Sequence, residues 1–322
     1  MMNKPVSRWI AYLPHAAIAA FFLACFLAFQ GDLRKVDLRA LPQAYGVYAC
    51  VIALAFASYV IRAVRWRMYL QQLGYDFPPF FGVLTYIAGF AYTLAPGKVG
   101  ELMKVTYYGR YGIPLSAVAA AFFVERLADL GVFVCLALVF LGFQAKGYGT
   151  MLAIAGLCVP VVVLAIAVLD AGQLRRIFRV PFVRNPRLDA IADAIVNATL
   201  SAKQLLTLRR LTGGLLLGFL AWGAECATLF VLAQIVPQTP IGFGDSIGIY
   251  AAAIVVGAIS FLPGGLGTTE ALLLALLVGY GFVMSDALLL TLVCRLLTLW
   301  FAVGLGWAAV GLLRVSRQGA SS

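Results

Sequence analysis

Long apolar runs are the feature that most limits what this chain can fold into. Four of them, at residues 13–29, 44–61, 151–169 and 211–236, reach or approach the roughly 20 apolar residues that a helix needs to cross the bilayer core. Only 11% of the 322 residues are charged, whereas soluble domains carry about 25%. Inside lipid a helix satisfies its own backbone hydrogen bonds. The sequence therefore predicts an all-α integral membrane protein.

We expect about six full spans and two re-entrant hairpins of broken helix, which makes up to eight membrane segments. The full spans are predicted at residues 14–30, 44–64, 115–143, 150–169, 211–236 and 286–313, and the hairpins at 77–112 and 246–282. The whole chain, 1–322, is predicted to be a single membrane domain. Its parts are a first span with an external loop (1–43), a first repeat half (44–169), a basic, amphipathic cytoplasmic segment (170–210) and a second repeat half (211–322).

The distribution of lysine and arginine predicts the orientation. With these spans, we place 18 of the 24 basic residues on the cytoplasmic side and four outside. Arg62, Arg65 and Arg67 are counted as cytoplasmic because they lie in the last turn of the second span or just after it. The positive-inside rule then puts both termini in the cytoplasm, in a multi-pass protein of a bacterial-type cytoplasmic (inner) membrane. This sorting explains the net charge of +11 without a nucleic-acid partner.

Two glycine motifs interrupt the apolar stretches, at residues 94–101 and 260–270. Both read Pro-Gly-x-Val/Leu-Gly and are followed shortly by glutamate. Proline removes a backbone donor, and each glycine costs a helix roughly 1 kcal/mol relative to alanine. A helix break is therefore predicted at each motif. The motif residues are Pro96, Gly97, Gly100, Pro263, Gly264, Gly265 and Gly267.

The two halves of the chain repeat one plan beyond the motifs. Glu101 precedes Arg126 by 25 residues, and Glu270 precedes Arg295 by the same number. The first hairpin would open to the cytoplasm and the second to the outside. Such an inverted repeat is common in transporters, whose binding sites lie near the midplane where broken helices meet. The alternative is that the glycines only allow helices to pack closely.

At these residues the sequence resembles the transmembrane, flippase-like domain of the lysylphosphatidylglycerol synthase family. The matching stretches are APGKVGE at 95–101 with Lys104, VERLAD at 124–129, and FLPGGLGTTE at 261–270 with Arg295. In the aminoacyl-lipid enzymes of that family this domain moves the lipid between leaflets, and a soluble domain makes it. The resemblance implies a stand-alone member without the soluble synthase domain, which translocates lipid without synthesising it.

The candidate substrate-binding and translocation residues are charged groups in or near the motifs and spans. They are Lys98, Glu101, Lys104, Glu125, Arg126, Asp129, Glu225, Glu270 and Arg295. Lys98, beside the exposed N–H groups of a helix start, suits a phosphate, although it could simply snorkel to the interface. Lys104 could be an ordinary positive-inside residue. The guanidinium of Arg126 suits bidentate phosphate contacts.

The acidic candidates have structural alternatives. Glu101 and Glu270 could hold an arginine, take up a proton or cap the broken helices. Glu125 and Asp129 lie four residues apart, so they share one helix face with Arg126 in reach. Glu225 could pair with Arg126 or with Arg295. Each of these groups could equally form a structural ion pair.

The favoured function is a flippase or scramblase for an anionic or phosphate-linked envelope lipid. The expected partners are that lipid, the anionic inner leaflet and enzymes of envelope lipid biosynthesis. No catalytic residue, metal site or cofactor is expected. The sequence has no Walker motif, which argues against direct use of ATP, and its six cysteines show no CxxC spacing, which argues against zinc. One alternative is an integral-membrane glycosyltransferase or lipid-modifying enzyme that uses Asp32 and Asp37. Another is a scaffold that docks a partner on 170–210.

Overall fold

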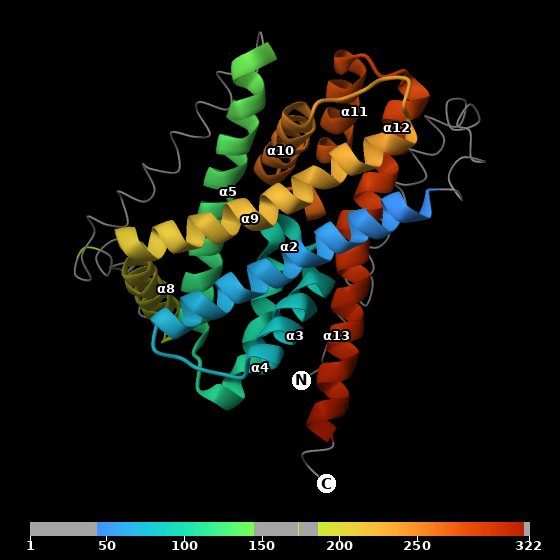
Figure 1. The fold of residues 1–322 in the computed structure, drawn as a ribbon. Helices are drawn as coiled ribbons and strands as arrows, with labels where there is room; N and C mark the ends of the chain where they lie inside the picture. The colour runs from blue at the N-terminus through green and yellow to red at the C-terminus, as the bar shows by residue number, and fades with distance from the viewer. Residues whose placement is uncertain (1–43, 145–172, 174–185, 319–322) are drawn as a thin grey trace, which may run out of the picture.

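The computed structural model describes residues 44–144, 173 and 186–318, and these residues form helices without any β-strand (Figure 1). The predicted spans at 14–30 and 150–169, the loop with Asp32 and Asp37, and most of the segment 170–185 lie outside the described residues. The predicted class, an all-α membrane protein, is confirmed. The number of spans and the re-entrant paths stay predictions.

Three stretches of the described chain are helical, long and apolar enough to cross a membrane. They are α2 (Tyr45–Gln72), α9 (Leu208–Leu232) continued by the 3-10 turn η5 (Ala233–Ile235), and the stretch Met284–Val315. A further helix, α5 (Leu115–Gln144), ends one residue beyond its predicted bound.

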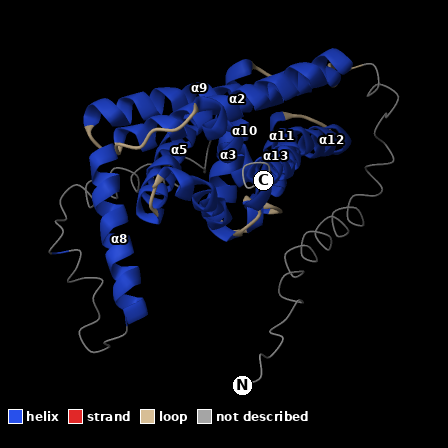
Figure 2. Ribbon diagram, turned by 90° about the horizontal axis from the view of Figure 1, so that it is seen from below, coloured by secondary structure: helices blue, strands red, loops and turns tan. Residues whose placement is uncertain are grey.

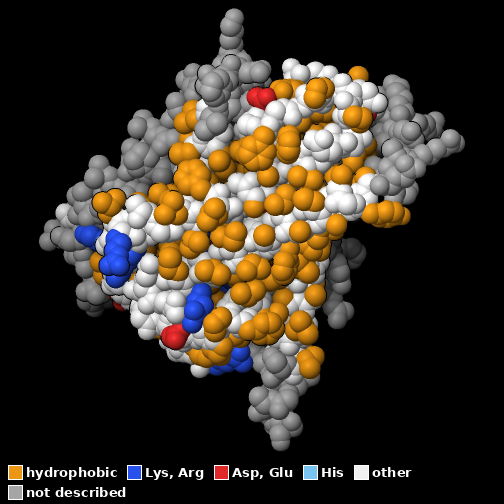
Figure 3. All heavy atoms as spheres, in the orientation of Figure 1, with side chains coloured by type: hydrophobic (Ala, Val, Ile, Leu, Met, Phe, Trp, Pro, Cys, Tyr) orange, Lys and Arg blue, Asp and Glu red, His pale blue; other side chains and the backbone are white. Residues whose placement is uncertain are grey.

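Helices α2 and α9 lie side by side along one side of the molecule (Figures 1 and 2). The face that they present is largely apolar, and its charged side chains gather at one end (Figure 3). Exposed apolar residues on it include Phe56 and Val64 of α2 and Leu216 and Leu220 of α9. An exposed apolar face of this kind suits contact with lipid tails.

The first predicted break is present. Helix α3 (Pro79–Gly89) and the 3-10 turn η2 (Phe90–Tyr92) are followed by non-helical residues and then by the 3-10 helix η3 (Pro96–Lys104). The chain continues through α4 (Val105–Tyr108) and η4 (Gly109–Tyr111). Helix η3 begins at Pro96, directly after the extended backbone of Ala95, because proline favours the first position of a helix. We expected this helix to begin near Glu101, five residues later.

The second predicted break separates α10 (Phe243–Ile259) from α11 (Thr268–Tyr280), with the 3-10 turn η6 (Pro263–Gly265) between them. Gly264, Gly265 and Gly267 have φ of 62°, 67° and 86°. Side chains disfavour this left-handed backbone, so the turn depends on glycine at these positions. Turn η6 contacts η3, and the two motifs therefore meet.

The predicted last span is one long helix with an irregularity in it. Helix α12 (Met284–Arg295) passes through a π-helical turn, η7 (Leu296–Trp300), into α13 (Phe301–Gln318). The Tyr59 hydroxyl donates a hydrogen bond of 2.5 Å to the carbonyl oxygen of Thr298 in that turn. π-turns often mark functional sites, and this one lies directly after Arg295.

Helix α8 (Pro186–Leu205) occupies the end of the basic segment and packs against α5. We expected Ile191, Ile195, Ala198 and Leu205 to form its apolar side. Leu205 is buried, and so is Ala202, three residues before it on the same side of the helix, whereas Ile195 is exposed. The predicted side is therefore buried near the C-terminal end of α8 and not at Ile195.

The apolar core has two clusters, and α5 contributes to both. Residues 117–124 of α5 belong to a cluster with α2, α3 and α13, while residues 132–137 belong to one with α9, α10 and α11. The charged residues Glu125, Arg126 and Asp129 lie on α5 between these two stretches.

We predict that Gly306→Ala lowers the thermal stability of the purified protein in detergent. A Cβ at Gly306 of α13 would lie 2.8 Å from the carbonyl carbon of Phe90 and 3.0 Å from the Cα of Ala91. Such overpacking typically costs about 1–3 kcal/mol. Gly304→Ala on the same helix is the control, since no atom lies within 4 Å of its added Cβ. Equal melting temperatures for the two variants would contradict the close packing of α13 on the first break.

Candidate functional site

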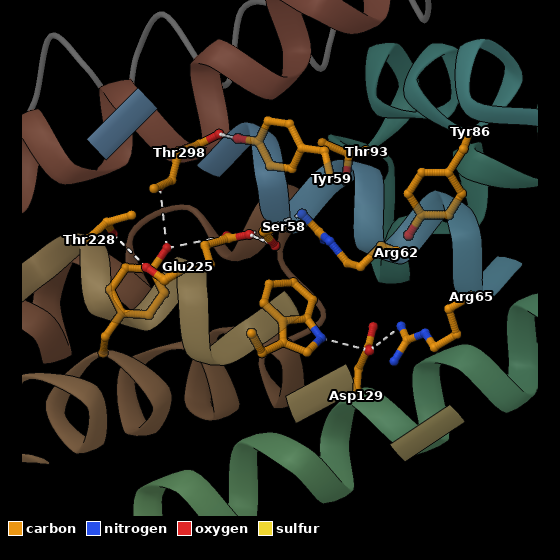
Figure 4. Close-up of polar contacts among 12 residues, drawn as sticks. Ser58, Tyr59, Arg62, Arg65, Tyr86, Thr93, Asp129, Glu225, Thr228 and Thr298 are labelled. Carbon is orange, nitrogen blue, oxygen red and sulfur yellow. Dashed lines mark hydrogen bonds and ion pairs between the residues drawn. The ribbon is translucent and has the colours of Figure 1, made fainter. Parts of the chain in front are cut away.

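A buried ion network is centred on α5. The guanidinium Nη2 of Arg65, on α2, lies 3.2 Å from Glu125 Oε1. It also lies 2.5 Å from Asp129 Oδ1 (Figure 4). The Tyr86 hydroxyl donates to Glu125 at 2.7 Å, and the Trp222 indole donates to Asp129 at 2.7 Å. The prediction that Glu125 and Asp129 share one helix face is confirmed, since one arginine reaches both.

Arg126 is the most open cation of this network. Its Nη2 lies 3.4 Å from Asp129, 3.5 Å from Glu125 and 3.8 Å from Glu101. Its side chain is 22% exposed, whereas those of the three carboxylates are 6% exposed or less. Neither its Nε nor its Nη2 makes a hydrogen bond to any residue that the structure describes. These two nitrogens are themselves buried, so the contacts of Arg126 with the three carboxylates are electrostatic and loosely directed.

Lys104 lies in an aromatic enclosure. Its Nζ is 4.0 Å from the ring centre of Trp66 and 4.4 Å from that of Tyr86. It is also 3.6 Å from Glu101 Oε2, and Glu101 accepts a hydrogen bond from Thr93 at 3.0 Å. The side chain of Lys104 is fully buried. Its interpretation as an ordinary positive-inside residue is therefore wrong, because cation–π contacts and a carboxylate stabilise it inside the fold.

Glu225 of α9 pairs with Arg62 of α2 at 3.0 Å, and the two side chains point toward each other (Figure 4). The Ser58 hydroxyl donates to the same carboxylate at 3.0 Å, and the Tyr250 hydroxyl donates to it at 3.4 Å. The guanidinium of Arg62 lies over the ring of Trp222 at 4.2 Å. The hypothesis that Glu225 pairs with Arg126 or Arg295 is wrong, because α2 rather than α5 or α12 presents the arginine.

Arg62 and Arg65 are functional candidates that were not predicted. They were taken for loop residues after the second span, but α2 continues to Gln72 and both side chains are buried within the protein. The predicted orientation of the chain in the membrane stays a prediction. A signal was present in the sequence, since Ser58, Arg62 and Arg65 follow one another at four and three residues and thus share a helix face.

Glu270 and Arg295 form the second motif's ion pair, at 2.6 Å. Arg295 Nη2 also donates to the carbonyl oxygen of Gly264 at 3.0 Å, and the Gly267 N–H donates to Glu270 at 2.7 Å. Glu270 thus holds an arginine and caps α11, which are two of the roles considered for it. Both glutamate–arginine pairs with the 25-residue spacing are in contact, although Glu101 and Arg126 are farther apart.

A cavity of about 350 Å³ joins the two motifs. Its charged lining comes from both halves of the chain: Arg62, Glu101, Arg126, Asp129, Glu225 and Arg295. Four buried aromatic side chains also line it: Tyr59, Phe90, Phe133 and Trp222. Three further lining residues, Ile259, Phe261 and Leu262, are exposed at the surface. The lining of the cavity is thus mainly apolar, with six charged side chains set into it and exposed apolar side chains at its border.

Phe261 has an unusual backbone at this border. Its φ of 54° is left-handed although it is not glycine, and its side chain is 72% exposed. Backbone strain of this kind clusters at functional sites. Gly264 and Gly265 of the same turn line the cavity as well.

Lys98 belongs to η3, but its side chain is not among those described, so its phosphate-binding role stays a prediction. The same holds for the side chain of Pro96 and for the space around Gly97. Gly100 is described, and a Cβ there would lie 2.8 Å from the Cβ of Ala95. In the described part of the chain, no cluster of histidine, cysteine, aspartate and glutamate is placed to hold a metal ion.

Comparison with known proteins gives one family and two relatives. The model of the family described as "Lysylphosphatidylglycerol synthase TM region" matches residues 15–306. A UPF0104 membrane protein of Pyrococcus horikoshii is 27% identical over 301 residues, which cover 85% of this chain and 87% of the relative. A UPF0104 membrane protein of Methanothermobacter thermautotrophicus is 26% identical over 320 residues, with 90% of each chain covered.

Proposed function

Because this chain belongs to the lysylphosphatidylglycerol synthase TM region family, we propose that it moves a phosphate-bearing membrane lipid between the two leaflets. The observation that carries the proposal is the cavity whose lining includes Arg62, Arg126 and Arg295. Guanidinium groups pair with phosphate in a bidentate manner. A charged group on a translocation route is expensive in lipid unless it faces a polar cavity.

The geometry supports a division of the lipid between two environments. The head group would enter the cavity, next to its charged side chains. The acyl chains would stay outside along Ile259, Phe261 and Leu262, which are exposed at the border of the cavity. We propose further that α3 with η3, and α10 with α11, are the two re-entrant hairpins of an inverted repeat. The contact between η3 and η6 supports this, since broken helices of transporters meet at the substrate site.

The ion pairs of the network support a transport function rather than an enzymatic one. Its carboxylates are already engaged: Asp129 and Glu125 with Arg65, and Glu225 with Arg62. A carboxylate beside a guanidinium is a weaker base than an unpaired one, because the cation favours its ionised form. We therefore propose that these groups bind and release a head group and make no covalent bond to it.

The test is lipid exchange in liposomes. Purified protein is reconstituted with phospholipids that carry a fluorophore on one acyl chain, and dithionite added outside quenches the outer leaflet. The wild type should quench nearly all of the fluorescence, whereas protein-free liposomes should protect about half. Retention of that protected half for every phosphate-bearing lipid would contradict the proposal.

We predict that Arg126→Gln slows this exchange by about tenfold or more, since a hydrogen bond to a charged group contributes about 1.5–3 kcal/mol. The matched control is Arg110→Gln. Arg110 is exposed and stacks on Phe81 at 4.0 Å, away from the cavity lining. Equal exchange rates for the two variants would remove Arg126 from the translocation path.

A further inference from the structure

The π-turn η7 is held by two tyrosines that come from other helices. The Tyr59 hydroxyl of α2 donates to the carbonyl oxygen of Thr298 at 2.5 Å (Figure 4). The Tyr250 hydroxyl of α10 lies 3.3 Å from the hydroxyl oxygen of the same threonine. Both tyrosines are buried. A buried tyrosine hydroxyl usually has a hydrogen-bond partner, so these contacts alone would show only that the helices pack together.

The turn changes the direction in which Arg295 points. In η7 the N–H of Phe301 donates to the carbonyl oxygen of Leu296, five residues earlier, whereas an α-helix would use Leu297. One residue of an α-helix corresponds to a rotation of about 100°. In a regular helix through the same residues, Arg295 at the end of α12 would therefore point in a different direction relative to α13. The π-turn thus determines where the guanidinium of Arg295 lies.

Tyr59 contacts Arg62 as well as the turn. The two residues are three apart on α2, and the central carbon of the Arg62 guanidinium lies 5.2 Å from the centre of the Tyr59 ring. The hydroxyl of the same ring reaches Thr298, three residues after Arg295. All four of these residues line the cavity. One tyrosine therefore contacts both an arginine of the first repeat half and the turn that directs an arginine of the second.

We infer that Tyr59 is a positioning residue for lipid translocation. Its hydroxyl fixes η7 and thereby orients Arg295, while its ring supports Arg62, so the two guanidinium groups keep one arrangement in the cavity. The inference rests on the proposed function. Bidentate contacts to phosphate require an oriented guanidinium. In enzymes, a displacement of about 1 Å at a site can slow the reaction about a hundredfold. Tyr59 thus acts through the two arginines rather than on the head group itself.

The test removes the hydroxyl and keeps the ring. Tyr59→Phe should slow lipid exchange in liposomes about tenfold, which lies within the loss that such a displacement can cause. Tyr280→Phe is the control and should exchange lipid at the wild-type rate, since the Tyr280 hydroxyl donates to Asp245 at 2.9 Å outside the cavity lining. A wild-type rate in Tyr59→Phe, or an equal loss in both variants, would overturn the inference. A wild-type protein that exchanges no lipid would instead contradict the proposed function.

A second comparison separates orientation from stability. In Arg295→Lys the cation is a point charge without a planar fork, so its contact with phosphate depends little on orientation. In that background Tyr59→Phe should cause less than about a twofold further loss of exchange, because a lysine has no fork to misalign. A further loss as large as that in the wild-type background would overturn the inference, since the hydroxyl would then act on the fold as a whole. Complete loss of exchange in an Arg295→Lys protein that elutes as a single species would support it, because only an oriented guanidinium then serves.

Discussion

Arg65→Ala should be among the most destabilising single substitutions in the described part of the chain. The change leaves Glu125 and Asp129 without the cation that lies 3.2 and 2.5 Å from them, in side chains that are 0% and 6% exposed. Breaking a buried ion pair by removing one partner costs about 3–5 kcal/mol. A large fall in the melting temperature of the purified protein in detergent is the expected result.

Arg67→Ala is the matched control, two residues along the same helix. Arg67 pairs with Asp76 at 2.9 Å, but the Asp76 side chain is 75% exposed. Exposed pairs contribute about 0–1 kcal/mol, so the melting temperature should change little. If both variants melt at the same temperature as the wild type, Glu125 and Asp129 do not depend on Arg65, and the buried network described above is wrong.

Glu270→Leu should also destabilise the protein, and its comparison with a double variant separates structure from transport. Alone, the change leaves Arg295 buried without its carboxylate, at a cost of about 3–5 kcal/mol. Glu270→Leu/Arg295→Met replaces both charges by apolar side chains of similar size. Such replacements are often neutral in stability. The double variant should therefore recover much of the melting temperature that the single variant loses.

Lipid exchange by the double variant then decides the role of the pair. We expect exchange to stay at the protein-free level, because the cavity has lost Arg295 as a donor. A double variant that is stable and also exchanges lipid at the wild-type rate would show that the pair only holds the turn together. Asp286→Asn is the control for a charge change on α12. Its carboxylate lies in the first turn of that helix, where its interaction with the helix dipole contributes only about 0.3–1 kcal/mol.

Features that depend on local chemistry could be predicted from the sequence. Long apolar runs predicted membrane helices, and Pro263 with its glycines predicted the break between α10 and α11. The shared spacing of 25 residues indicated that the two halves repeat one plan, and the glutamate and arginine of each half are in contact, Glu101 with Arg126 and Glu270 with Arg295. In each case the information lies within one helix or between two copies of one motif.

Features that depend on which helices become neighbours could not be predicted in the same way. Arg62 and Glu225 are 163 residues apart, and no repeat relates them. The positive-inside rule treats every arginine after a span as a loop residue, so it misplaced Arg62 and Arg65, which α2 carries into the interior. Only the packing of α2 against α5 and α9 shows that these arginines have buried partners.

The long sequence separation of these pairs bears on how the protein is made. Arg65 precedes Glu125 by 60 residues, and Arg62 precedes Glu225 by 163, so α2 leaves the ribosome well before either carboxylate exists. An unpaired arginine at the centre of a membrane helix costs about 2.5–3.5 kcal/mol during insertion. Helix α2 therefore has a weaker tendency to enter the bilayer by itself than its apolar sequence suggests. The two arginines of α2 therefore obtain their carboxylate partners only after α5 and α9 have been synthesised.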